Sequence, residues 1–347
     1  MVIIALIERF NYFCALLMRI TQTEMKKIRM IINPISGRGS KDTIPERARE
    51  VLAGEEYALE IFQTEYAGHA SILTKEAIAM GTDIILAVGG DGTINEVARA
   101  MLHTEATLGI IPVGSGNGLA RELSIPLEVQ KALEVVKTGK TIAIDYCKAN
   151  DEVFFCTCGI GFDASVSMRF SKEKHRGPIV YAKTAITEYF RFRPEMCEII
   201  MGDEVISGKT FLVACGNASQ YGNNAFIAPN ASIQDGYFDV SVLKPINPLD
   251  VGPVVVQLFT KQLKKNHKFE AYRTQNMIIR REKPGVMHID GEPIIMDREI
   301  HIQSFPQGLN VLIPTNPMPL VYDMPSFFHY VSRWLTDIKN AQFKGNS

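Results

Sequence analysis

The sequence lacks an excess of either charge, because 37 lysines and arginines stand against 38 aspartates and glutamates. This balance excludes a general affinity for polyanions, and we expect no nucleic-acid partner. Cysteine is scarce as well: six are scattered along 347 residues, and Cys156 and Cys158 form a lone C-x-C without a second metal-ligand pair. Buried free thiols are therefore expected rather than a metal centre, which is typical of a protein of the reducing cytoplasm.

The amino-terminal 30 residues lack the features of a cleaved signal peptide or a membrane span. Glu8 and Arg9 interrupt the apolar stretch, and no small-residue cleavage site follows them. Neither apolar piece reaches the ~20 residues that a bilayer-spanning helix needs. We expect Met25 to be the true start and residues 1–24 to be an extension or a loosely held amphipathic helix.

Two nucleotide-binding signatures are also missing. The sequence contains no G-x-x-x-x-G-K-[ST], which excludes a P-loop enzyme, and "GSGNG" lacks the spacing of the dinucleotide motif G-x-G-x-x-G. Hydride transfer is therefore not expected.

The segment from residue 26 to about residue 123 contains four apolar runs, each followed by small polar residues and a helical pattern. The runs predict strands at 28–32, 59–63, 84–88 and 108–113. A helix is expected after each strand: one at 45–52, one that reaches residue 80, one that begins at Thr93 and one that runs through Arg121. This alternation predicts a doubly wound parallel α/β domain, which binds ligands beyond the carboxyl ends of its strands.

The stretch "AVGGDGTINEVARAML", residues 87–102, shows the pattern most clearly. A buried strand leads into glycines around Asp91, and Thr93 with Glu96 forms a capping-box pattern that predicts the helix start. Backbone N–H groups at such a helix end favour phosphate. Small polar residues follow the other three strands too. Four successive strand ends of this kind indicate a phosphate site.

From residue 141 the sequence changes to short alternating runs, which predict antiparallel strands with a turn at residues 150–151 and one helical stretch at 164–191. We predict an α/β domain at 25–140, a larger β-rich, sandwich-like domain at 141–300, and a segment at about 301–325 that returns to the first domain. Residues 326–347 are predicted to be an amphipathic helix and tail, with Phe327, Phe328, Val331, Trp334, Leu335 and Ile338 on one face.

Five separated motifs carry a family resemblance. "NPISG", "GGDGTINEV", "IPVGSGNGLAR", "APNASIQDGYFDV" and "HIDGEP" occur in the order found in the diacylglycerol kinase catalytic-domain family, which the chain resembles from about residue 26 to 314. The family includes bacterial diacylglycerol kinases and the sphingosine and ceramide kinases. The resemblance implies an ATP- and Mg²⁺-dependent kinase that phosphorylates a lipid hydroxyl at the membrane surface, most simply diacylglycerol to phosphatidic acid. It also implies that 25–140 is the ATP-binding domain and 141–300 the lipid-substrate domain.

The resemblance also implies site residues. Glu292 is the implied general base, and Asp91 organises metal or water. A structural magnesium site is implied at Asp235, with the backbone carbonyls of Ser232 and Tyr237 as further ligands. The implied ATP contacts are Asn33, Pro34, Ile35, Ser36, Gly37, Thr64, Gly90, Asp91, Gly92, Thr93, Ile94, Asn95, Glu96 and Ser115.

Several alternatives stay open. "GSGNGLA" is closer to sphingosine-type kinases than to the bacterial G-T-x-N-D-F, so the acceptor could be a sphingoid base or ceramide. NAD kinases share GGDG, and an inactive lipid- or nucleotide-binding regulator is a further possibility. His288 and His301 are expected to be packed or solvated rather than catalytic. We expect a cytoplasmic protein in transient contact with the membrane, where the basic stretches 169–177 and 261–268 could face anionic lipid, and a homodimer is compatible with the sequence.

Overall fold

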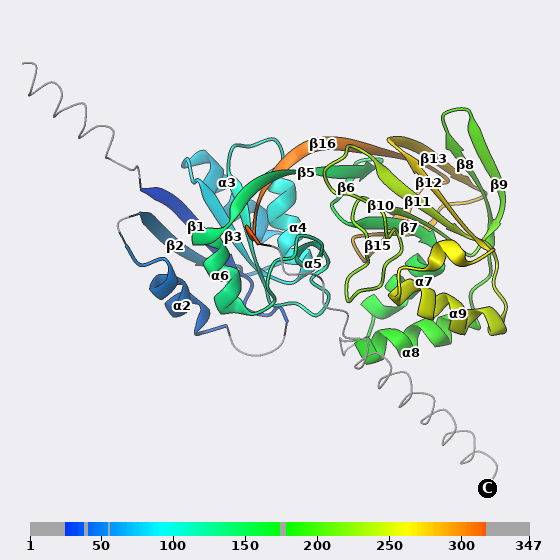
Figure 1. Cartoon of the computed structure of the whole chain (residues 1–347), viewed down its shortest axis with the longest axis horizontal. Helices are drawn as coiled ribbons and strands as arrows, with labels where there is room; N and C mark the ends of the chain where they lie inside the picture. The colour runs from blue at the N-terminus through cyan, green and yellow to red at the C-terminus, as the bar shows by residue number, and fades with distance from the viewer. Residues whose placement is uncertain (1–24, 38–40, 55, 174–177, 317–347) are drawn as a thin grey trace, which may run out of the picture.

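The computed structural model describes residues 25–37, 41–54, 56–173 and 178–316. The amino-terminal part alternates strands with helices (Figure 1). Its elements are β1 (Lys26–Ile32), α2 (Ile44–Val51), β2 (Tyr57–Gln63), α3 (His69–Ala79), β3 (Ile84–Gly89), α4 (Asp91–Ala100), β4 (Thr107–Pro112), α5 (Gly118–Glu122) and α6 (Val129–Thr138). Strands β2, β1, β3 and β4 pair in that order and all are parallel, so the predicted α/β fold class is confirmed.

The rest of the chain is mainly antiparallel. It contains β5 (Lys140–Ala149), β6 (Glu152–Phe154), β7 (Thr157–Gly161), α7 (Phe162–Ser171), α8 (Pro178–Tyr189), β8 (Glu195–Met201), β9 (Glu204–Thr210), β10 (Leu212–Gly216), β11 (Phe238–Leu243), α9 (Pro248–Phe259), the short 3₁₀ helix η1 (Leu263–Lys265), β12 (Phe269–Thr274), β13 (Asn276–Arg281), β14 (Gly285–Ile289), β15 (Glu292–Met296) and β16 (Glu299–Ile313). A six-stranded sheet runs in the order β12-β11-β10-β7-β14-β15.

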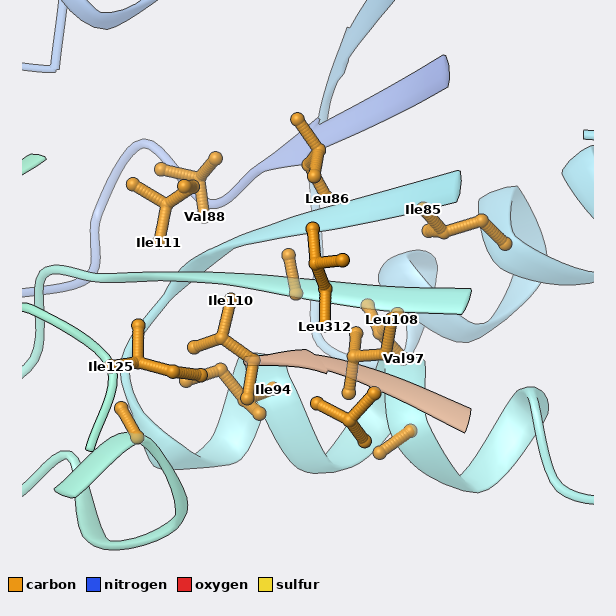
Figure 2. Packing of buried hydrophobic residues seen from close by; sticks show 14 of the residues in the cluster. Ile85, Leu86, Val88, Ile94, Val97, Leu108, Ile110, Ile111, Ile125 and Leu312 are labelled. Atoms are coloured by element: carbon orange, nitrogen blue, oxygen red, sulfur yellow. The ribbon is translucent and has the colours of Figure 1, made fainter. Parts of the chain in front are cut away.

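Strand β16 belongs to both halves of the molecule. Near its end Val311 pairs in parallel with Leu108 of β4, whereas its first residues pair with β13, and β5 runs antiparallel along most of its length. The ten-stranded sheet therefore extends from β2 to β9 without interruption. Figure 2 shows Leu312 of β16 on the same side of the sheet as Leu86, opposite to Leu108 and Val97, and all four belong to the buried core of the first domain.

Strand β16 crosses the predicted boundary at residue 300 between the β-rich domain and the returning segment. The pairing between β5 and β16 shifts between Phe305 and Leu309. A Cβ atom on Gly308 would lie 2.4 Å from the Tyr146 ring, and Gln307 has a positive φ of 53°, so the strand bends here without ending. Residues 1–24 and the predicted tail helix at 326–347 lie outside the described residues.

Two helix predictions need correction. The predicted helix over 164–191 is two helices, α7 and α8. Helix α4 begins at Asp91 rather than Thr93, and no side chain caps it. Thr93 Oγ1 instead accepts a hydrogen bond from Asn33 Nδ2 at 2.9 Å, and Glu96 Oε1 accepts one from Gly68 N at 3.2 Å. The capping-box residues bind neighbouring loops because those loops converge on the start of this helix.

Among the described residues, no helix combines the length and apolar character that crossing a bilayer requires.

A buried carboxylate holds the bend of β16. Asp145 of β5 is fully buried and accepts N–H groups from Gly236 at 2.6 Å and Gln307 at 2.8 Å.

We predict that Asp145→Asn lowers the free energy of unfolding by about 1–3 kcal/mol, because an amide nitrogen cannot accept one of these two buried N–H groups. Urea denaturation measures the change. Asp151→Asn, in the exposed β5–β6 turn, is the matched control and should change stability by less than ~0.5 kcal/mol. Equal stability of both variants would contradict the anchoring role of Asp145.

Candidate active site

Four loops meet at the carboxyl edge of the parallel strands. Asn33 N donates to Val88 O at 3.0 Å, Thr64 N donates to Ile32 O at 2.9 Å, and Val113 N donates to Gly89 O at 3.0 Å. The structure therefore brings the predicted nucleotide-contacting residues of all four loops to one edge. Among them, Thr64 is buried and Ser115 is exposed.

The loops touch at glycines. A Cβ atom on Gly37 would lie 1.7 Å from Val113 O, and one on Gly114 would lie 2.6 Å from the Cα atom of Gly90. Side chains at these positions would separate the loops. The edge is consequently lined by main chain, which suits phosphate oxygens that accept backbone N–H groups.

Asp91 holds two of these loops together. Its Oδ2 accepts a hydrogen bond from Asn117 N at 2.9 Å, and its Oδ1 accepts one from Gly118 N at 2.6 Å. The carboxylate thus binds the start of α5 from the first residue of α4. Sequence reasoning assigned Asp91 to metal or water and did not find this contact, because its partners are main-chain atoms.

The other predicted nucleotide residues differ in how they face this edge. Ile35 is 89% exposed, whereas Ile94 is 1% exposed and its side chain packs in the core (Figure 2). Ile94 can reach a ligand only through its backbone. Asn95 is buried, and its amide donates to Asp290 Oδ2 at 3.1 Å, which links this helix to the second domain.

The turn between β14 and β15 reaches the same edge. Asp290 has a φ of 49°, and its carboxylate accepts N–H groups from Phe155, Cys156 and Thr157 at 2.8–2.9 Å. Burial still raises the pKa of Asp290, although those three hydrogen bonds oppose the shift. Asp290 therefore fixes the turn, a role that the sequence did not reveal.

Glu292 lies two residues further on, over the first turn of α4. A Cβ atom on Gly92 would be 2.9 Å from Glu292 Oε1, so the carboxylate and the helix start are in contact. Partial desolvation raises the pKa of Glu292; the Arg99 cation lowers it, whereas Asp290, Glu96 and Asp91 raise it further. An exposed carboxylate with a raised pKa beside the amino-terminal end of a helix, where backbone N–H groups favour phosphate, is suited to accept a proton close to a phosphate group.

The predicted magnesium residues lie elsewhere. Asp235 forms an ion pair with Arg273, whose guanidinium also lies over the Tyr237 ring, and Asp235 Oδ1 accepts the Tyr237 N–H at 3.0 Å. Ser232 lies three residues before Asp235. The guanidinium neutralises the one carboxylate of this predicted set, so the residues as arranged do not fit a bound cation, and that site stays a prediction.

The described residues contain no cluster of three or more histidine, cysteine, aspartate or glutamate side chains that could hold a metal ion. The two histidines considered in the sequence analysis are not among the residues at the carboxyl edge of the parallel strands. His288 is buried and within 3.1 Å of Asp163 Oδ2, and His301 is exposed beside Glu299.

Comparisons with known proteins agree with this architecture. Residues 27–149 match the diacylglycerol kinase catalytic domain, and residues 156–313 match the YegS C-terminal NAD kinase beta sandwich-like domain. The chain is 30% identical over 305 residues to a probable lipid kinase YegS-like protein of Pectobacterium atrosepticum, covering 84% of this chain and 98% of that protein. A protein of the same name from Serratia proteamaculans is 28% identical over 289 residues, covering 81% and 93%.

Two crystal structures from Bacillus anthracis share the fold. One is titled a putative diacylglycerol kinase and has a TM-score of 0.71 at 23% identity; the other, titled a diacylglycerol kinase, has a TM-score of 0.66 at 21% identity. Each similarity covers 86% of this chain and all of that chain.

We predict that Asp91→Asn weakens ATP binding at least tenfold and lowers the free energy of unfolding by about 1–3 kcal/mol, because the amide cannot accept both N–H groups at the start of α5. Isothermal titration calorimetry with ATP and urea denaturation measure the two effects. Asp203→Asn, in the exposed turn between β8 and β9, should change neither. Unaltered ATP affinity in Asp91→Asn would separate Asp91 from the nucleotide site.

Proposed function

The chain belongs to the diacylglycerol kinase catalytic-domain family, in its group of YegS-like lipid kinases, and from that premise we propose that it transfers the γ-phosphoryl group of ATP to the hydroxyl of diacylglycerol, giving phosphatidic acid. The contact of the Glu292 carboxylate with the first turn of α4 at Gly92 carries the proposal. It puts a potential base from the second domain against the proposed phosphate site of the first.

In the proposed reaction, Glu292 accepts the proton of the lipid hydroxyl. The hydroxyl oxygen forms a bond to the γ-phosphorus while the bond to the β-phosphate oxygen breaks, and ADP leaves. A positioned general base of this kind contributes about 10²–10⁴ in rate. Asp91 acts as a positioning residue because it fixes the start of α5, and Asp290 fixes the turn that carries Glu292.

Magnesium fits the proposed nucleotide edge better than the predicted Asp235 site. Mg²⁺ in kinases is held by one or two carboxylates together with substrate phosphates and waters, and it neutralises phosphate charge when bound. Asp91, at the start of α4, and Glu96, in its second turn, would hold the ion together with the phosphates, because both lie on the helix that begins at this edge.

A sphingoid base is the second candidate acceptor, since the sequence at 114–117 is Gly-Ser-Gly-Asn. Purified protein with labelled ATP, assayed against diacylglycerol, sphingosine, ceramide and NAD, distinguishes these acceptors. We expect labelled phosphatidic acid. Phosphorylation of NAD would overturn the lipid assignment, and absence of turnover on every acceptor would favour an inactive regulator.

We predict that Glu292→Gln lowers kcat by about 10²–10⁴ with ATP affinity unchanged, because the amide cannot accept the hydroxyl proton. Glu282→Gln, an exposed glutamate in the preceding loop, is the matched control and should retain full activity. Near-normal turnover in Glu292→Gln would exclude Glu292 as the base.

Asp290→Asn tests the turn separately. It should lower stability as well as activity, because three backbone N–H groups converge on the Asp290 carboxylate.

The acid limb of the pH profile should report Glu292. The base must be ionised, so kcat/KM falls as the pH drops through its pKa, which partial desolvation raises above the usual glutamate range. Removing the Arg99 cation removes an influence that lowers this pKa. We predict that Arg99→Met shifts the acid limb to higher pH, whereas Lys137→Met, on α6, leaves it in place. A shift to lower pH, or none, would contradict the assignment.

A further inference from the structure

Helix α9 departs from the pattern of a surface helix. No residue of α9 is buried, yet its sequence, PLDVGPVVVQLF, contains one charged residue, Asp250. A soluble surface helix places polar side chains on its outer face, and a helix that is apolar all round is normally buried in protein or in lipid. The environment that covers α9 in the working protein is thus not supplied by the described chain.

The outer face of α9 comprises Leu249, Gly252, Pro253 and Val256, which recur at helical spacing and are all exposed. Leu249 is 87% exposed and Val256 42% exposed. The opposite side of the helix already has partners, because Val254 and Leu258 pack against the cluster around Phe211 and Leu263. The helix therefore has one packed side and one apolar side open to its surroundings.

The end of α8 extends this surface. Tyr189 Oη donates to Ile246 O at 3.3 Å, immediately before α9, and a cavity of about 280 Å³ lies between these segments, lined in part by Phe190, Arg193 and Ile246. Phe190 is 68% exposed. Helices α7, α8 and α9 lie together along one side of the six-stranded sheet, away from β13 and β16 (Figure 1).

Exposed cations flank the apolar surface at both ends. Arg191 and Arg193 follow α8, and Lys264 and Lys265 follow α9. The one carboxylate on α9, Asp250, is paired with Lys268 at 2.6 Å. An apolar strip with a cationic border matches an anionic lipid surface, where apolar side chains enter the acyl boundary and cations contact the headgroups.

We propose that the outer face of α9, with Phe190 and the four flanking cations, docks the protein on an anionic membrane. This inference rests on the proposed lipid kinase function, which requires access to an acceptor held in a bilayer. A second copy of the chain fits this surface less well, because a symmetric contact would bring the cationic borders together.

The test uses the full chain in vesicle co-sedimentation without ATP or acceptor lipid. Wild-type protein should bind vesicles of phosphatidylcholine with phosphatidylglycerol, and bind pure phosphatidylcholine at least tenfold more weakly. Leu249→Asp/Val256→Asp should reduce binding to the anionic vesicles at least tenfold. Arg191→Glu/Lys264→Glu should do the same, since each cation near such a surface strengthens binding about fivefold. Val205→Asp, at an exposed valine of β9, is the matched control and should bind like wild type.

Unchanged binding in both double variants, or no wild-type binding to the anionic vesicles, overturns the proposal. Thermal unfolding checks that the variants fold. If Leu249→Asp/Val256→Asp does not fold, Arg191→Glu/Lys264→Glu still tests the proposal. Light scattering tests whether a second copy of the chain occupies this face. If the wild type is a dimer, Leu249→Asp/Val256→Asp is a monomer and vesicle binding is unchanged, the face belongs to a second copy and the docking proposal is overturned.

A kinase assay separates this proposal from the function on which it rests. Leu249→Asp/Val256→Asp should raise the apparent KM for vesicle-embedded diacylglycerol at least tenfold and leave kcat on dispersed dioctanoylglycerol unchanged. Equal loss on both acceptors would place the face in the catalytic cleft and overturn docking. If wild type binds vesicles but phosphorylates no lipid, the proposed function fails while docking stands.

Discussion

The carboxylate of Asp290 is the contact on which the candidate site depends. It accepts three backbone N–H groups from residues 155–157 and the Asn95 amide from α4, so one side chain joins the turn of the second domain to a helix of the first. Burying a carboxylate is costly unless such donors compensate it, and the raised pKa of Asp290 shows that the compensation is incomplete. These hydrogen bonds of Asp290 determine the position of Glu292 over α4.

A second carboxylate has the same kind of role within the first domain. Asp91 joins the β3 and β4 loops through main-chain N–H groups, and glycines allow those loops to approach within contact distance. Asp145 similarly holds the bend of β16. Asp91, Asp145 and Asp290 are thus used, wholly or in part, to fix backbone. The exposed Glu292 carries no comparable set of hydrogen bonds within the described part of the chain.

The sequence predicted the parallel strands well, because β1, β3 and β4 are short continuous apolar runs buried on both faces. It misplaced the start of α4, because Thr93 and Glu96 have partners in other loops that local pattern cannot reveal. Helix α9 went unrecognised, since Gly252, Pro253 and a run of valines lack amphipathic spacing. The role of Asp290 was hidden for a different reason: its partners are backbone groups far away in sequence, which no residue pattern marks.

The shared strand β16 has a consequence for how the chain folds as the ribosome makes it. Val311 completes the parallel sheet beside Leu108, yet it is synthesised after nearly all of the second domain. The first domain cannot fill its sheet while it emerges, and the gap beside β4 stays open until the carboxyl-terminal strand has left the ribosome. Pairings this distant in sequence form slowly, and an unfilled strand edge is open to wrong partners meanwhile. The two halves therefore reach the native state together, rather than as successive independent units.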